Sequence, residues 1–319
     1  RVPAPSMSSI ISAGNSRWQL WPIWPARPVR LMVAYPPGGV SDEIARVLAR
    51  QVGALLGMPV LVIHRPGAGG TVAMEALAKA PPDGHTLCFS AITPLSLSPH
   101  LGPVGYDPVA DIAPVVNVMF TPVLVVGTPA FTGRHFADLI AQARASRGAI
   151  RWASSGVGTT GHMVVEQVGR ASGARLTHVP YKGGGQQIAD ALGGHVEVLS
   201  TNVGEQQLRY VAEGRLKPLA VGAPVRLDSL PSVPTLAELG YPQANRVSVF
   251  GVFAPGGTPL AVLTRLNGLF NQALRAEAVR EHMRVAHHVP TGGTAETFGA
   301  LIGREYQLNR DLMTWQARP

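Results

Sequence analysis

The stretch Gly67-Ala68-Gly69-Gly70-Thr71 and its earlier counterpart Pro36-Pro37-Gly38-Gly39-Val40-Ser41 decide the fold of this chain. A short apolar run precedes each stretch and an amphipathic run follows it. This layout is typical of a turn between a strand and a helix. Paired glycines leave the backbone N–H groups bare at the positive end of the coming helix, where an anion binds well. A single turn of this kind is more often a plain connector.

Strand-like and helix-like segments alternate along the rest of the chain. We expect strands at 31–34, 60–63, 86–90, 122–126, 149–153, 175–179, 196–199, 217–221 and 247–253. We expect helices from an N-cap at Ser41 to a C-terminal glycine at Gly57, and at 71–79, 134–145, 161–171, 185–192, 205–213, 260–274, 278–285 and 295–315. The alternation predicts an α/β fold with mostly parallel sheets.

Glycine- or serine-rich turns follow several of these strands, at 36–41, 67–71, 154–160 and 181–185. In open α/β sheets, ligands bind beyond the carboxyl ends of the strands. If two of the turns lie in each of two domains, they face one another across a cleft.

Length and composition limit the possible classes of protein. The 319 residues predict two domains, and 46% hydrophobic with 14% charged residues favours a packed core over disorder. The net charge of +8 is scattered, so it favours anionic ligands weakly and predicts no nucleic-acid surface. The only cysteine, Cys88, excludes an intramolecular disulfide and lies in an apolar run, which predicts a buried and inert thiol.

The first 28 residues differ in character from the rest. They begin at Arg1 and carry Trp18, Trp21 and Trp24 among prolines, without a recognisable signal-peptide core. We interpret the chain as a processed product and residues 1–28 as a leader that is poorly ordered or packed on the body. Every later segment of membrane-spanning length contains a charge, Gly or Pro, which favours a soluble protein.

A set of motifs in fixed order carries a family resemblance. They are Tyr35-Pro-Pro-Gly-Gly-Val-Ser-Asp-Glu-Ile-Ala-Arg46, Arg65-Pro-Gly-Ala-Gly-Gly70, Pro82-Asp-Gly-His-Thr86, Ser154-Ser-Gly-Val-Gly-Thr-Thr-Gly-His162, His178-Val-Pro-Tyr-Lys-Gly183, Pro231-Ser-Val-Pro-Thr235 and Ala254-Pro-Gly-Gly-Thr-Pro259. Over about residues 26–319 the chain resembles the Bug-type extracytoplasmic receptors of tripartite tricarboxylate transporters. The resemblance implies a periplasmic solute-binding protein with two α/β domains, of the type II-like periplasmic binding fold. Such a receptor closes on a small di- or tricarboxylate, or another organic acid, and delivers it to a membrane permease.

The resemblance also implies ligand-binding residues. They are Tyr35, Pro37, Gly38, Gly39, Gly69, Gly70, Thr71, Ser90, Thr93, Ser154, Ser155, Gly156, Thr159, His162, Lys182 and Asn202. Ser154 and Thr159 are the strongest side-chain candidates. His162 is equally well explained as a cap of its loop, and Lys182 as a surface lysine. Asp42 and Arg46 have the i, i+4 spacing of an ordinary helical ion pair, so we expect them to be structural.

Three departures from the family pattern bear on specificity. His64 replaces a frequent Asn, and His85 replaces an aromatic residue. After the strand expected at 196–199, the neutral Ser200-Thr201-Asn202 replaces a frequent acidic residue. A ligand ammonium group would have no partner there, so we expect a plain carboxylic acid rather than an amino acid.

We expect one domain from 29–126 plus 251–319 and another from 127–250. The two crossings between them, near 125–126 and 249–252, would form a hinge.

An enzyme is the main alternative class. The 67–71 turn lacks the third glycine of a dinucleotide fingerprint because position 72 is Val, and a Gly-Lys-Ser/Thr phosphate loop is missing. Ser154, His162 and Asp42 could form a hydrolase triad, but the sequence has no Gly-x-Ser-x-Gly elbow. The histidines show no zinc spacing. We therefore predict no catalysis, cofactor or metal. A receptor of the same fold that signals through a sensor protein remains an alternative to one that serves transport.

Overall fold

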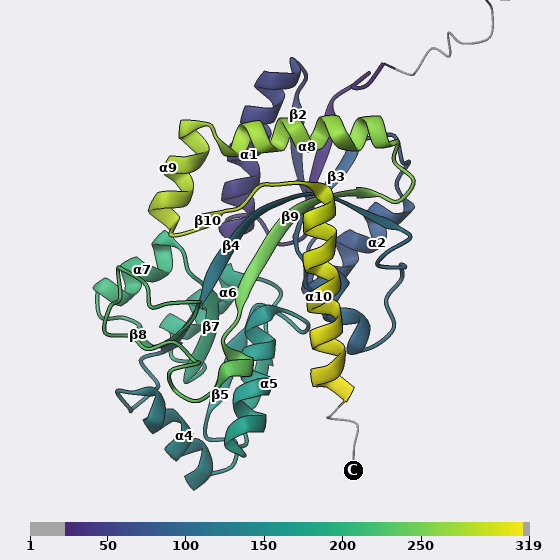
Figure 1. Ribbon diagram of the computed structural model, residues 1–319. Helices are drawn as coiled ribbons and strands as arrows, with labels where there is room; N and C mark the ends of the chain where they lie inside the picture. Colours follow the sequence, from purple (N-terminus) through teal and green to yellow (C-terminus); the bar gives the residue numbers. More distant parts are fainter. Residues whose placement is uncertain (1–22, 315–319) are drawn as a thin grey trace, which may run out of the picture.

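The computed structural model describes residues 23–314 as an α/β protein built on one long curled sheet (Figure 1). The strands are β1 (Val29–Val33), β2 (Val60–His64), β3 (Thr86–Ala91), β4 (Ile112–Gly127), β5 (Arg151–Ser154), β6 (Thr177–Pro180), β7 (Val198–Asn202), β8 (Lys217–Gly222), β9 (Val247–Pro255) and β10 (Val289–Pro290). Their order is β2-β1-β3-β9-β4-β7-β5-β6, and β8 and β10 also pair with β4.

The helices pack around this sheet. They are α1 (Val40–Leu56), α2 (Thr71–Lys79), α3 (Thr93–Ser96), α4 (Phe136–Ala145), α5 (Thr160–Ser172), α6 (Gly184–Leu192), α7 (Glu205–Ala212), α8 (Leu260–Leu274), α9 (Glu277–Ala286) and α10 (Ala295–Thr314). Short 3-10 turns lie at Ala68–Gly70, Ser98–His100 and Pro242–Ala244.

Strands β4 and β9 connect the two halves of the molecule. Figure 1 shows both running from the half that carries α1 and α8 to the half that carries α4 and α5. The first part of β4 pairs with β9 and β10, and its last part pairs with β7 and β8, all antiparallel. The outer strands β2-β1-β3 and β7-β5-β6 are parallel. The sheet is therefore parallel at both ends and antiparallel in the middle.

Each half has its own apolar core. Leu31, Phe89 and Phe270 belong to a buried cluster in the first half, and Trp152 and Leu139 to one in the second. Burial of large side chains such as these, at roughly 25 cal/mol per Å² of apolar surface, is the main force that holds the helices on the sheet.

Local sequence patterns predicted most helices and strands close to their positions in the structure. Helices 71–79 and 260–274 have the predicted bounds, and Gly57 ends α1 with φ +64. The predicted N-cap at Ser41 is wrong, because α1 begins at Val40 with Gly39 as its N-cap. Strand β7 lies further along the chain than the predicted 196–199, so Ser200-Thr201-Asn202 belong to the strand.

Strand β4 is much longer than the predicted 122–126. Pro114 and Pro122 interrupt its apolar pattern, and proline is usually a sign that a strand has ended. The structure accommodates Pro114 at a shift in register between β4 and β9.

Two buried groups near the start of the sheet were anticipated in part. Cys88 is buried, as predicted, and burial raises the pKa of its thiol. Trp24 donates from Nε1 to the Gly84 carbonyl at 2.9 Å, and its own carbonyl accepts a bond from Arg265 Nη1 at 2.6 Å.

Residues 1–22 of the predicted leader lie outside the described residues. Among residues 23–314, no helix combines the length and the hydropathy needed to cross a bilayer.

Candidate functional site

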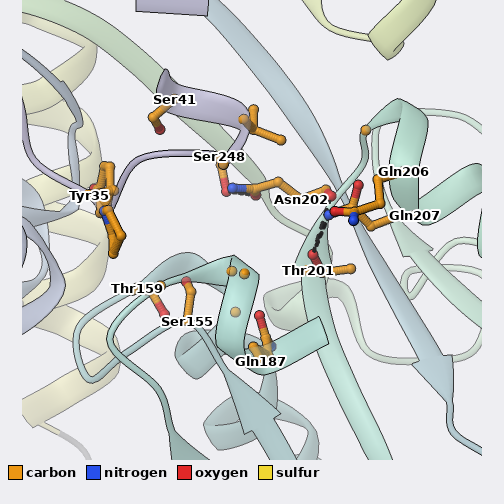
Figure 2. A pocket seen from close by; sticks show the side chains of 18 of the residues that line it. Tyr35, Ser41, Ser155, Thr159, Gln187, Thr201, Asn202, Gln206, Gln207 and Ser248 are labelled. Carbon is orange, nitrogen blue, oxygen red and sulfur yellow. Dashed lines mark hydrogen bonds between the residues drawn. The ribbon is translucent and has the colours of Figure 1, made fainter. Parts of the chain in front are cut away.

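A cavity of about 580 Å³ lies where the first turns of α1, α5, α6 and α7 meet. Its walls come from both halves of the molecule: the 36–41 turn and Phe250 on one side, and the 155–161 and 182–187 segments on the other. Figure 2 shows polar side chains from these separate elements pointing into the same space. The labelled residues are Tyr35, Ser41, Ser155, Thr159, Gln187, Thr201, Asn202, Gln206, Gln207 and Ser248.

The 36–41 turn is held by the carboxylate of Asp42. Its Oδ2 accepts the Gly38 N–H at 2.9 Å, and its Oδ1 lies 2.9 Å from Arg46 Nε and 2.7 Å from His64 Nε2. Burial pushes the pKa of Asp42 upward, but the bonds from Gly38, His64 and Arg46 outweigh it and lower the pKa. The predicted Asp42–Arg46 pair is confirmed, and His64 is a further partner.

Gly38 has φ +87, a backbone conformation that favours glycine. The Asp42 carboxylate takes the Gly38 N–H, but the N-cap Gly39 offers no side chain to the first amides of α1, which lie at the cavity wall with no intrahelical acceptor.

The opposite wall is the turn between β5 and α5. Thr159 is the N-cap of α5: its Oγ1 accepts the His162 N–H at 3.3 Å and donates to the Gly156 carbonyl at 2.7 Å. Ser155 and Thr159 both line the cavity, whereas Ser154 does not.

A pair of stacked histidines lies behind this turn. The rings of His162 and His178 are 4.1 Å apart and nearly parallel. His162 Nδ1 accepts the Gly158 N–H at 3.1 Å, and its Nε2 lies 3.2 Å from Glu166 Oε1. Burial, followed by repulsion from His162, lowers the pKa of His178 to about 4. The contacts of His162 are therefore those of a loop cap.

The remaining walls are rich in amide side chains. Gln187 on α6 donates from Nε2 to the Ser200 carbonyl at 2.7 Å. Gln207 on α7 donates from Nε2 to Thr201 Oγ1 at 3.3 Å, and Ser248 donates to Asn202 Oδ1 at 2.6 Å. The sequence reasoning missed Gln187, Gln207 and Ser248. The two glutamines lie near the starts of helices that follow glycines, and that pattern could have indicated them as cavity residues. Ser248 lies on β9, far away in the sequence, so no local pattern indicated it.

Charged side chains of both signs line the cavity. Lys182 and Arg209 bring positive charge, while Glu43 and Glu205 bring negative charge. Residues 200–202 are themselves neutral, but Glu43 and Glu205 bring carboxylates to other parts of the wall, so the preference for a plain acid over an amino acid stays a prediction. Since these charges balance, the first turns of the helices are the remaining source of positive potential.

Tyr35 and Thr93 complete the wall near β3. The hydroxyl of Tyr35 accepts the Ala91 N–H at 3.3 Å, and burial raises its pKa to about 12. Tyr35 therefore stays neutral at physiological pH.

The cavity brings together part of the predicted set. The residues that line it are Tyr35, Pro37, Gly38, Gly39, Thr93, Ser155, Thr159, Lys182 and Asn202. The residues outside its lining are Gly69, Gly70, Thr71, Ser90, Ser154, Gly156 and His162.

The 67–71 turn does not line the cavity and instead contacts the turn between β5 and α5. A Cβ added to Gly69 would overlap the Val157 carbonyl oxygen, so the two turns touch backbone to backbone. The hydroxyls of Thr71 and Ser90 donate to the carbonyls of Ala68 and Ala91.

The groups considered for catalysis are not assembled as a triad. Ser154 Oγ lies 2.6 Å from His178, not His162, and Asp42 is bonded to Gly38, Arg46 and His64. Within residues 23–314, no group of three His, Cys, Asp or Glu side chains is arranged to hold a metal ion.

This chain is similar to proteins of a receptor family. Residues 44–290 match the model of the tripartite tricarboxylate transporter family receptor. Protein BugT of Bordetella pertussis is 36% identical over 282 residues, covering 88% of this chain and 86% of that protein.

Solved structures extend the similarity to the fold. The periplasmic binding protein BugD superposes with a TM-score of 0.85 at 27% identity, covering 91% of this chain and 98% of BugD. MatC from Rhodopseudomonas palustris, with bound malate, gives 0.85 at 26% identity over 91% of this chain and 100% of MatC. R. palustris Rpa4515, with adipate, superposes with a TM-score of 0.82 at 30% identity, covering 89% of this chain and 95% of Rpa4515.

Proposed function

Because the chain belongs to the tripartite tricarboxylate transporter receptor family, we propose that it captures a small carboxylate in the periplasm and delivers it to a membrane permease. The ligand is held in the cavity between the two halves, and we assign it to the di- or tricarboxylates or related organic acids.

The convergence of helix N-termini on one cavity carries this proposal. Helices α1, α5, α6 and α7 all begin at its wall. The first-turn N–H groups of a helix lack intrahelical acceptors and carry partial positive charge, so they bind carboxylate oxygens directly or through water. A Cβ built on Gly184 or Gly185 meets nothing within 4 Å, so the start of α6 is open to a ligand.

The positions of the turns support a ligand with two acidic ends. The 36–41 turn and the 155–161 turn belong to opposite halves of the molecule, and each leads into a helix whose first residues line the cavity. Malate and adipate, found in the two Rhodopseudomonas palustris structures, are dicarboxylates. We assign one carboxylate to each turn.

We also propose that the two halves are domains that close on the ligand. The boundaries are those expected from the sequence, 29–126 plus 251–319 and 127–250, with the hinge in β4 and β9. Strand β4 pairs with β9 and β10 along its first part and with β7 and β8 along its last part, so a small twist in it would move one half relative to the other. Helix α10 also contacts the second half, through Asn309 to Arg246 and the Leu312 carbonyl to Arg170.

Thermal unfolding against a ligand panel tests the function. The panel contains di- and tricarboxylates, amino acids, nicotinate and aromatic acids, with NAD and ATP as controls. A ligand at 100 times its dissociation constant stabilises the native state by about 2.7 kcal/mol, which raises Tm by a few degrees. We expect shifts with one or two carboxylates. A shift with a nucleotide alone would overturn the receptor assignment.

A further inference from the structure

One nitrogen of the His162 ring holds the turn between β5 and α5. Its Nδ1 accepts the Gly158 N–H at 3.1 Å, and its Nε2 lies 3.2 Å from Glu166 Oε1. A backbone N–H only donates, so Nδ1 must be unprotonated and the ring hydrogen must lie on Nε2, directed at Glu166. The neutral ring in this tautomer is therefore the form that fits the turn.

A second proton on this ring would disturb the turn. Placed on Nδ1, it sets a donor against the Gly158 N–H, which then loses its acceptor. The stacked ring of His178 lies 4.1 Å away, and its Nε2 is directed at Ser154, next to the same turn. Burial, followed by repulsion from His162, lowers the pKa of His178 to about 4, so His178 stays neutral in mild acid. Among the two stacked rings, the one that bonds the backbone of the turn is therefore His162.

Glu166 is the carboxylate placed to balance a charge on His162. A protonated ring would keep the bond from Nε2 to Glu166 and form an ion pair with it. Strands β6 and β7, which pack against α5, carry no ionisable side chain apart from His178. Ionisable side chains on the surrounding elements are bonded to other groups or exposed at the edge of the cavity. They are Arg170 (bonded to the Leu312 carbonyl), Arg151 (to Glu197), Tyr181 (to Asp190), Arg246 (to Asn309), His100 (to the Tyr306 carbonyl), Arg310 (paired with Asp311) and the exposed Lys182.

The turn that His162 holds is a wall of the cavity. Ser155, Thr159 and Gly161 line the cavity, and the first two are labelled in Figure 2. The ring of His162 lies behind the turn and is not part of the lining. A charge on it would attract a carboxylate only weakly, because Glu166 would be paired with that charge. A proton on His162 therefore acts on the ligand mainly through the shape of the turn.

The ligand and this proton have opposite requirements. A bound ligand contacts the turn in its present shape, whereas a proton on Nδ1 needs the Gly158 N–H to move away. Two binding events with opposite requirements weaken each other by the same factor. We propose that His162 is a positioning residue that holds the ligand-facing turn only while Nδ1 is unprotonated, so that mild acid weakens carboxylate binding. This inference rests on the proposed carboxylate-binding function and adds its regulation.

Calorimetric titrations at about pH 7.5 and about pH 5.5, on either side of the range where histidines ordinarily titrate, test the inference. The probes are malate, adipate and citrate. In His162→Asn, Oδ1 stands near the position of Nδ1 and accepts the Gly158 N–H without titrating. We expect wild-type affinity to fall about fivefold or more relative to His162→Asn between the two pH values, as for the loss of one hydrogen bond. Protonation of the ligand itself is common to both proteins and cancels in this ratio.

Two further variants complete the comparison. In His162→Gln the side-chain amide stands near the position of Nε2, so the Gly158 N–H loses its acceptor at every pH. Its carboxylate binding should be weak at both pH values, close to that of the wild type in acid. His195→Asn replaces an exposed histidine outside the cavity and should keep the wild-type pH dependence.

A ratio of wild-type to His162→Asn affinity that is the same at both pH values overturns the inference, and so does a wild type that gains affinity in acid relative to that variant. If His162→Asn fails to fold, the Gly158 amide signal of isotope-labelled wild-type protein decides by NMR. We expect acid to shift this signal and bound ligand to lower the pH at which it shifts, and a signal that ignores pH overturns the inference. Carboxylate binding with a constant ratio leaves the proposed function intact, whereas no carboxylate binding at the higher pH overturns both.

Discussion

The hydroxyl oxygen of Ser154 lies 2.6 Å from Nε2 of His178, behind the turn whose next residue, Ser155, lines the cavity. Ser154 Oγ also accepts the Gly156 N–H at 3.2 Å and donates to the Gly156 carbonyl at 3.1 Å. All these bonds form together if His178 donates from Nε2, which assigns its neutral tautomer. Ser154 thus shapes the loop that presents Ser155 and Thr159 to the cavity.

The two adjacent serines should therefore separate stability from affinity. Ser154→Ala leaves buried donors without an acceptor and should lower the free energy of unfolding by about 1–3 kcal/mol. Ser155→Ala removes a group that lines the cavity and should weaken carboxylate binding with little loss of stability. Urea denaturation and calorimetry of both variants check this. Equal losses of stability in the two would contradict the assigned roles.

Contact between the 67–71 turn and the 154–160 turn should be needed for tight binding. Gly69→Ala would push a Cβ into the Val157 carbonyl, which belongs to the other half, and so hold the turns apart. Gly57→Ala is the matched control, because Gly57 has φ +64 against +66 for Gly69 but open space around its Cβ. Both variants should lose about 1–2 kcal/mol of stability from backbone strain. Only Gly69→Ala should also weaken ligand binding, as measured by calorimetry.

Lys182 should contribute long-range attraction more than a fixed contact. It is exposed at the edge of the cavity, next to the glycines that open α6. Lys182→Met should weaken binding of a dicarboxylate by less than about tenfold, with the difference shrinking at high salt. Lys79→Met removes the same charge from the exposed ion pair with Glu75, outside the cavity, and should not change affinity. Titrations at two ionic strengths test both.

Stability should decrease in mild acid because of His288, a buried residue of the cavity wall. Burial, with His282 and His287 nearby, lowers its pKa to about 4, and its Nε2 lies 3.2 Å from the Val203 carbonyl. An unfolded histidine titrates near about pH 6.5. Below that pH the unfolded chain binds a proton that native His288 does not, so the free energy of unfolding falls toward pH 4.

The expected slope from His288 approaches about 1.4 kcal/mol per pH unit between its two pKa values. Urea denaturation between about pH 6.5 and pH 5 measures it while most carboxylates stay ionised. His288→Gln should flatten this slope, and His195→Gln, at an exposed position, should not. An unchanged slope in His288→Gln would assign the effect to another group, with His178 the first to examine.

Much of the framework follows from local sequence. The bounds of α2 and α8, the end of α1 at Gly57 and the Asp42–Arg46 pair depend on residues within a few positions of one another. Helical periodicity, glycine conformation and i, i+4 pairing act over that range, so the sequence alone was sufficient. The same patterns placed the 36–41, 154–160 and 181–185 turns at strand ends, and all three contribute to the cavity wall.

Tertiary structure decided which side chains the site contains. The sequence gives no reason to assign different roles to the adjacent Ser154 and Ser155. The structure assigns them different roles because Ser154 contacts His178, which comes from another strand. Gln187, Ser248 and His288 meet in one cavity only because β4 and β9 carry the chain between the halves. No spacing along the chain reports such distances, since they are set by how sheet and helices pack.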